Sequence, residues 1–152
     1  METFDRAKAA RVWQRVQGDA ATNPTRGLQG MIAEEWADAA LYLSLSKRVQ
    51  GNAANILRKI GQEEQAHMAC LKGIYTLQGA GRPDIPAPSP VDRAPVSVML
   101  RRCYGREMRC LAQYESRTND PEYGQIFARM AQQEREHCRL LLELLGSLPP
   151  DK

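Results

Sequence analysis

The strongest pattern in this sequence lies in two short segments, EQAH at residues 64–67 and EREH at residues 134–137. These segments contain the chain's two histidines, and each histidine follows a glutamate by three residues. Side chains at this spacing emerge on the same face of an α-helix. A single Glu–His pair is ordinary on a helix surface, but its presence at both histidines argues against chance.

The two segments belong to a longer internal repeat. Glu35 stands seven residues before Tyr42 in the first copy, and Glu107 stands seven residues before Tyr114 in the second. The chain therefore contains Glu-x6-Tyr, a turn and Glu-x-x-His twice, offset by 72 and then 70 residues. Such a duplication predicts a site built around a pseudo-two-fold axis. Glu34 competes with Glu35 for the first position, but its spacing to Tyr42 does not match the second copy.

The rest of the chain predicts an all-α fold. Aromatic residues make up only 6% of the chain, and the commonest residues are good helix formers. Apolar positions recur at helical spacing through most of the sequence. We expect a short N-terminal helix over about residues 3–17, followed by four long helices over about residues 26–49, 52–77, 96–117 and 121–145.

The helix boundaries and connections predict a four-helix bundle. We expect Asn52 to cap the second long helix, Asp120 with Pro121 to start the fourth, and Gly146 to end it. Residues 78–95 contain two glycines and five prolines, so they form an extended connection that can run the length of a helix. The bundle, residues 26–146, is thus two antiparallel hairpins joined by a long crossover, with a separate helix and linker over residues 1–25.

Composition excludes several classes of function. A chain of 152 residues with net charge +3 and mixed signs indicates one soluble domain without a nucleic-acid partner. No apolar run approaches the roughly 18 residues of a membrane span, and the N-terminus is too charged for a secretory signal. The cysteines form no CxxC pair, so reduced thiols and a cytoplasmic location are expected. The four cysteines of the chain are Cys70, Cys103, Cys110 and Cys138.

Four glutamates pointing into a bundle would place a charge near −4 in its core. Unpaired buried charges cost several kcal/mol each, and two divalent cations would cancel them. Oxygen ligands with one imidazole per metal suit iron or manganese better than structural zinc. The candidate metal ligands are Glu35, Glu64, His67, Glu107, Glu134 and His137.

On these residues the sequence resembles the ferritin-like di-iron superfamily, and most closely its rubrerythrin-type domains, over about residues 26–145. The resemblance implies a ferritin-like bundle that holds two iron ions. It implies that the glutamates at 35 and 107 and the histidines at 67 and 137 are terminal ligands, and that the glutamates at 64 and 134 bridge the metals.

The resemblance also implies a function, a non-haem di-iron oxidoreductase that reduces hydrogen peroxide or O₂. Electrons would come from an external rubredoxin-like protein or flavoprotein, and a homodimer is expected. Cys110 stands where rubrerythrins usually carry an additional carboxylate, which weakens the analogy to peroxidase activity. The alternatives are a ferroxidase or iron-binding protein, manganese catalase or O₂-dependent hydroxylase chemistry, and a bundle that binds metal for stability alone.

Side chains near the motifs carry further expectations. Tyr42 and Tyr114 are expected to hydrogen-bond to ligand carboxylates, with redox chemistry beside the metals or core packing as the alternatives. Asp38 is expected to make a hydrogen bond, with an additional ligand role as the alternative. Glu63 and Glu136 are expected to face solvent, and the cysteines to fill the core, with thiol redox chemistry as their alternative.

Overall fold

The computed structural model of the chain describes residues 27–79 and 81–149, and these contain four helices and no strand. The predicted all-helical class is confirmed for these residues. The expected helix over residues 3–17 and the segment 1–25 lie outside them. The helices are α2 (Leu28–Ser46), α3 (Gly51–Leu77), α4 (Val96–Glu115) and α5 (Gly124–Ser147).

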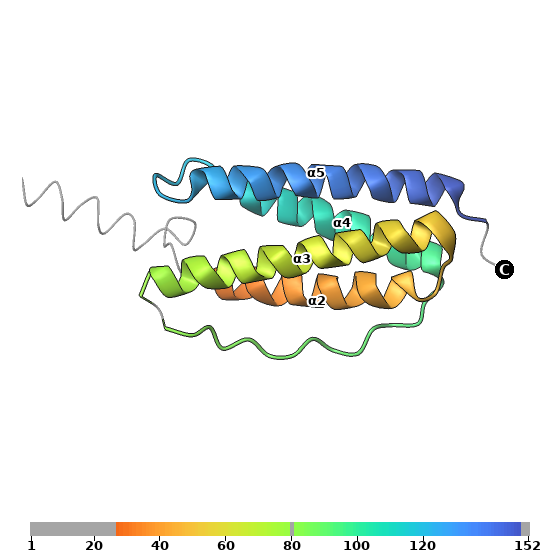
Figure 1. Cartoon of the computed structure of the whole chain (residues 1–152), viewed down its shortest axis with the longest axis horizontal. Coiled ribbons are helices and arrows are strands. Elements are labelled where there is room, and N and C mark those ends of the chain that lie inside the picture. The colour runs from red at the N-terminus through yellow and green to blue at the C-terminus, as the bar shows by residue number, and fades with distance from the viewer. Residues whose placement is uncertain (1–26, 80, 150–152) are drawn as a thin grey trace, which may run out of the picture.

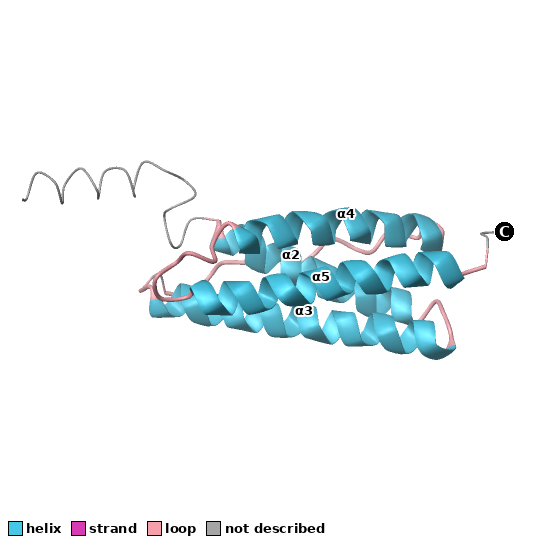
Figure 2. Ribbon diagram, turned by 90° about the horizontal axis from the view of Figure 1, so that it is seen from above, coloured by secondary structure: helices cyan, strands magenta, loops and turns pink. Residues whose placement is uncertain are grey.

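The four helices lie side by side in a bundle made of two hairpins (Figures 1 and 2). Helix α2 pairs with α3, and α4 pairs with α5, through short turns at residues 47–50 and 116–123. The chain then passes from one end of the bundle to the other between α3 and α4. Within this passage residues 81–95 form neither helix nor strand, as their prolines require.

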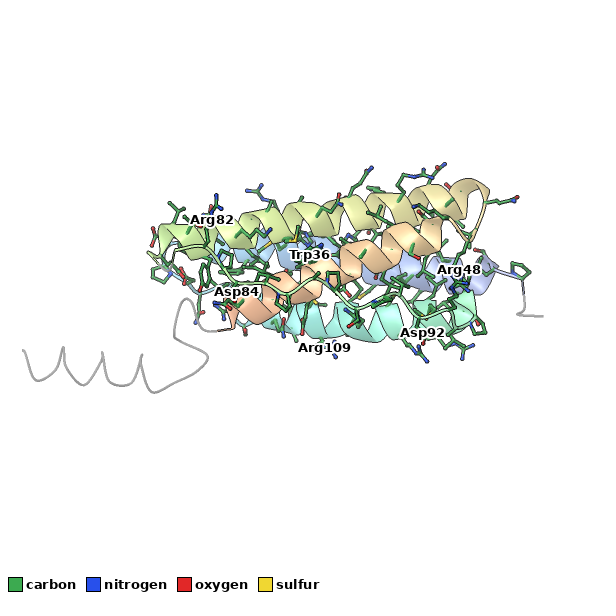
Figure 3. The ribbon with its side chains drawn as sticks, turned by 90° about the horizontal axis from the view of Figure 1, so that it is seen from below. Trp36, Arg48, Arg82, Asp84, Asp92 and Arg109 are labelled. Carbon is green, nitrogen blue, oxygen red and sulfur yellow. The ribbon has the colours of Figure 1, made fainter. Side chains whose placement is uncertain are left out.

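Hydrogen bonds hold the end of the crossover against α4 and the turn that follows α2. Arg48, just after α2, donates a hydrogen bond to the Ala94 carbonyl at 2.8 Å. Asp92 accepts one from Arg102 of α4, also at 2.8 Å, and another from the Ala94 backbone N–H. Arg48 and Asp92 lie near the same end of the bundle (Figure 3). These contacts fix where the second hairpin begins.

Two helix starts differ from the sequence-based expectation. Asn52 does not cap α3, because the helix begins one residue earlier at Gly51 and Gln50 is its N-cap. Asp120 and Pro121 do not open α5 directly. Asp120 instead accepts hydrogen bonds from the backbone N–H groups of Glu122 and Tyr123, at 2.9 and 2.8 Å. This turn occupies residues 121–123 and delays the helix to Gly124.

Helix α5 also continues past its predicted end. The Leu144 carbonyl accepts the Leu148 N–H at 2.9 Å, so helical bonding runs through Gly146. The chain leaves the helix only at Leu148, whose backbone is extended (φ −71°, ψ 142°). Among the described residues, no helix combines the length and apolar character needed to cross a membrane.

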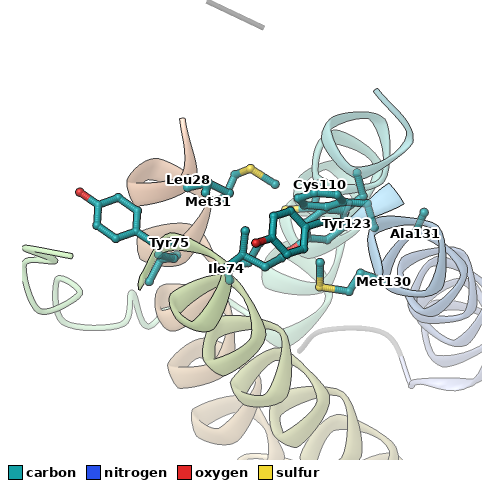
Figure 4. Packing of buried hydrophobic residues seen from close by; sticks show 12 residues of the cluster. Leu28, Met31, Ile74, Tyr75, Cys110, Tyr123, Met130 and Ala131 are labelled. Carbon is teal, nitrogen blue, oxygen red and sulfur yellow. The ribbon is translucent and has the colours of Figure 1, made fainter. Parts of the chain in front are cut away.

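Two apolar layers fill the bundle interior, and each takes side chains from all four helices. Figure 4 shows one layer, where Leu28 and Met31 of α2, Ile74 of α3, Cys110 of α4 and Met130 of α5 approach one another. The other layer lies toward the opposite end of the helices and includes Leu45, Leu57, Leu100 and Leu141, all fully buried. The middle of the bundle is left for polar side chains.

The packing predicts opposite effects of alanine at two glycines. A Cβ at Gly124 would lie 2.3 Å from the backbone oxygen of Thr118, so Gly124→Ala should lower the unfolding free energy by about 1–3 kcal/mol. Gly105 is exposed within α4, and apart from its chain neighbours and its own helix backbone no atom lies within 4 Å of the place that an alanine methyl group would take. Gly105→Ala should therefore raise the unfolding free energy by about 0.5–1 kcal/mol. Urea unfolding measures the unfolding free energy of each variant. A change of the same sign and size in both variants would contradict this packing.

Candidate metal centre

The polar layer consists of one buried glutamate from each helix together with two histidines. Each glutamate lies among the apolar positions of its helix, so the same periodicity that buries the core also buries the carboxylate. All four glutamates are at most 1% exposed, and the histidines at most 3%. The structure brings together all six candidate ligands: Glu35 on α2, Glu64 and His67 on α3, Glu107 on α4, and Glu134 and His137 on α5.

The six side chains form two overlapping groups, each of which could hold a metal ion. Within each group, one candidate ligand atom per residue lies within 4.8 Å of the others. Glu64 and Glu134 belong to both groups, which therefore describe two adjacent positions with two shared carboxylates. The groups are Glu35, Glu64, His67 and Glu134, and Glu64, Glu107, Glu134 and His137.

The histidines present their Nδ1 atoms to the carboxylates. His67 Nδ1 lies 2.9 Å from Glu134 Oε1, 3.2 Å from Glu64 Oε2 and 3.6 Å from Glu35 Oε2. His137 Nδ1 lies 3.0 Å from Glu64 Oε1. It is also 3.5 Å from the nearer oxygen of the helix α4 glutamate. An imidazole nitrogen and carboxylate oxygens therefore converge at each of the two positions.

The outer nitrogens of the histidines contact the residue before the glutamate of the opposite motif. His67 Nε2 lies 2.7 Å from Gln133 Oε1, and His137 Nε2 lies 2.7 Å from Glu63 Oε2. Donation of the Nε2 proton to these oxygens leaves each Nδ1 lone pair facing the cluster. The expectation that Glu63 faces only solvent is wrong, although Glu136 does pair with Arg139 in a 45% exposed position.

Sequence reasoning missed Glu63 and Gln133 although a signal for them exists. They are equivalent positions of the internal repeat, 70 residues apart, and both carry a side chain with an oxygen acceptor. A polar residue repeated immediately before both motif glutamates is therefore the observation that could have found them.

Two tyrosines connect the two copies of the repeat. Tyr42 of α2 donates a hydrogen bond to Glu107 Oε1 of α4 at 2.5 Å, and Tyr114 of α4 donates one to Glu35 Oε1 of α2. Burial, together with the nearby carboxylates, raises the pKa of both phenols, so they stay protonated and act as donors. Each tyrosine thus orients a carboxylate of the other copy, and not the one on its own helix.

Many of the buried nitrogen and oxygen atoms in the cluster have no hydrogen-bond partner. Nine buried side-chain nitrogen and oxygen atoms in the described residues have no hydrogen-bond partner, and six of these belong to the cluster. They are Glu35 Oε2, Glu64 Oε1, Glu107 Oε2, both oxygens of Glu134, and His137 Nδ1. Unpaired lone pairs that face one another fit the donor set of a hard cation, which would satisfy them together.

Without a cation the cluster holds protons to limit its charge. Burial raises the pKa of Glu64 well above its ordinary value and that of Glu134 to about 11. Burial opposes the charge on His137, but the nearby carboxylates of Glu107 and Glu63 raise its pKa to about 9. Burial also disfavours charge on Glu107, yet the neighbouring Glu134 and His137 hold its pKa at about 2. Protons therefore limit the charge that a bound cation could otherwise cancel.

Asp38 lies beside the cluster but in neither ligand group. It is 3% exposed and forms an ion pair with Arg106 of α4 at 2.5 Å. Burial raises its pKa to about 7, while the Arg106 guanidinium acts in the opposite direction. A polar contact was the favoured expectation for Asp38, and Arg106 is its partner.

The cysteines have the character of core residues. All four are free thiols, and Cys103 and Cys110 pack within the two apolar layers. Burial raises the pKa of Cys103 to about 12 and that of Cys138 to about 11, and it also raises the pKa of Cys110. Since the thiolate is the reactive form, these properties favour core packing over thiol chemistry.

The metal-free chain should lose stability as the pH rises from about 6 to about 9. The folded-state pKa values of His137 and Glu134, about 9 and about 11, lie above the ordinary 6.5 and 4.5. The folded chain therefore binds more protons than the unfolded chain in this range, and its stability is lost with rising pH. Thermal unfolding in chelator measures this effect.

The Glu134→Gln variant is the control for this pH dependence, because its amide does not titrate and its slope should be shallower. A melting temperature of the metal-free protein that rises over the same range would contradict the assignment of these protons.

Comparison of the chain with models of protein families, with curated proteins and with solved structures gave no match in any of the three. The case for a metal site therefore rests on the residues of this chain. The buried carboxylate and histidine cluster could hold a metal ion, and the duplicated arrangement offers two adjacent positions for one.

Proposed function

We propose that this chain is a rubrerythrin-like member of the ferritin-like superfamily, a non-haem di-iron oxidoreductase that reduces hydrogen peroxide or O₂. One observation carries the proposal: the two ligand groups overlap in Glu64 and Glu134. Two carboxylates common to both groups suit a pair of adjacent metal ions, whereas a single ion would leave one group without a charge partner.

The chemistry of the donor set supports iron, with manganese as the alternative metal. Four carboxylates balance two divalent ions, and each position combines oxygen donors with one imidazole nitrogen. Glu35 with His67 would complete one position, and Glu107 with His137 the other. None of the cysteines belongs to either ligand group, so the set lacks the thiolates that structural zinc sites usually contain.

A pair of ferrous ions supplies two electrons, which is the number needed to convert hydrogen peroxide and two protons into two waters. The protein's own part is to hold the carboxylates in place and to limit water. Tyr42 and Tyr114 each fix one oxygen of a terminal glutamate and leave the other available. The apolar layers on both sides separate the site from the ends of the bundle. A rubredoxin-like protein or flavoprotein would restore the ferrous state.

Removal of a shared carboxylate tests the metal assignment. Glu134→Gln keeps the shape of the side chain but removes a charge common to both groups, so the purified variant should retain fewer than two irons per chain. Glu136→Gln is the matched control, because Glu136 lies on the same helix and contacts Arg139 outside the cluster. Metal content and unfolding temperature are measured for the variant and for the control. Two tightly bound irons per chain in both Glu134→Gln and Glu64→Gln would contradict the assignment of the ligands.

The reaction itself is tested by loading the metal-free protein with Fe(II) without oxygen and mixing it rapidly with peroxide or O₂. Faster oxidation by peroxide, with two irons retained per chain, is the expected result. Faster oxidation by O₂, with iron released or accumulated beyond two per chain, would identify a ferroxidase for which iron is the substrate. Reaction with neither oxidant, together with a lower melting temperature after metal removal, would identify a structural metal.

A further inference from the structure

We propose that Glu63 makes the two metal positions unequal, so that the first divalent ion binds between Glu107 and His137 and the second fills the Glu35–His67 position more weakly. This inference rests on the proposed function, because it requires that the cluster binds two metal ions. It concerns the order and affinity of binding, which the proposed function leaves open.

The two copies of the repeat match in geometry at this point but differ in charge. His137 Nε2 lies 2.7 Å from a carboxylate oxygen of Glu63, and His67 Nε2 lies 2.7 Å from the amide oxygen of Gln133. Both acceptors lie on the helix that faces the histidine, α3 for Glu63 and α5 for Gln133. The acceptor type is therefore the difference between two otherwise equivalent contacts.

A carboxylate acceptor strengthens the imidazole as a ligand. When Nε2–H donates to a negative oxygen, electron density shifts toward Nδ1, which becomes a better donor to a cation. An amide oxygen fixes the same tautomer without adding charge. His137 is completely buried and the Glu63 side chain is 26% exposed, so water screens only part of the attraction between Glu63 and an ion at Nδ1. Contacts of this kind typically change metal affinity by about 10–100-fold.

The neighbouring charges do not cancel this difference. Lys59 lies 4.0 Å from Glu63, but its side chain is 63% exposed, so the pair is screened by water. Asp38 is also specific to the first copy, but Arg106 balances its charge in a direct ion pair. The ligands themselves are shared or equivalent, because Glu64 and Glu134 belong to both positions and a tyrosine holds each terminal glutamate.

Titration of the metal-free full-length chain with Co(II), followed by visible absorption and calorimetry, tests the proposal. The natural chain should bind two ions in two steps, the first about tenfold or more tighter than the second. Glu63→Gln should weaken the first step by about tenfold, so that the two steps merge. Gln133→Glu should instead strengthen the second step. Glu136→Gln, which removes an equal charge outside the cluster, should change neither step.

Two histidine variants identify which position fills first. His67→Ala should keep the tighter step, whereas His137→Ala should lose it. Equal affinities in the natural chain, an unchanged first step in Glu63→Gln, or loss of the tighter step in His67→Ala would each overturn the inference and leave the proposed function intact. A natural chain that binds no Co(II) would overturn the proposed function and this inference together.

Discussion

Mutual repulsion among four buried carboxylates is the constraint on which this structure depends. Each of the four helices contributes one glutamate to the same layer, and none of these side chains is more than 1% exposed. Carboxylates in such a place stay only if protons, hydrogen bonds or cations offset their charge. The apolar layers at the two ends hold the helices together and prevent the carboxylates from moving apart. Core packing thus maintains an arrangement that electrostatics opposes.

The site belongs to neither hairpin alone. Helix α2 packs mainly on α3, and α4 packs mainly on α5, but the tyrosine hydrogen bonds run between α2 and α4. The histidine contacts with Glu63 and Gln133 likewise run between α3 and α5. Polar contacts therefore join the hairpins at the level where the carboxylates meet. The cluster is complete only where the two hairpins pack together.

Much of this could be predicted from local patterns, because helical periodicity and proline content depend on neighbours in the chain. The spacings of three and seven residues between motif positions also placed the six buried polar side chains on common faces. The repeat marks Glu63 as a paired position, but its contact with His137, like that of Arg106 with Asp38, could not be predicted in this way. Both depend on how helices from different hairpins are rotated against each other. The late start of α5 depends on a turn around Asp120 that competes with helix formation.

The crossover allows the two copies of the repeat to differ in sequence, because it joins both hairpins in one chain. It joins opposite ends of the bundle and is fastened beside α2 and α4 through Arg48 and Asp92. Two separate, identical hairpins could form a similar bundle, but any change would then appear on both sides of the axis. A covalent tether makes their encounter intramolecular and allows each half to acquire its own substitutions. The contrast between Glu63 and Gln133 is not available to two identical hairpins.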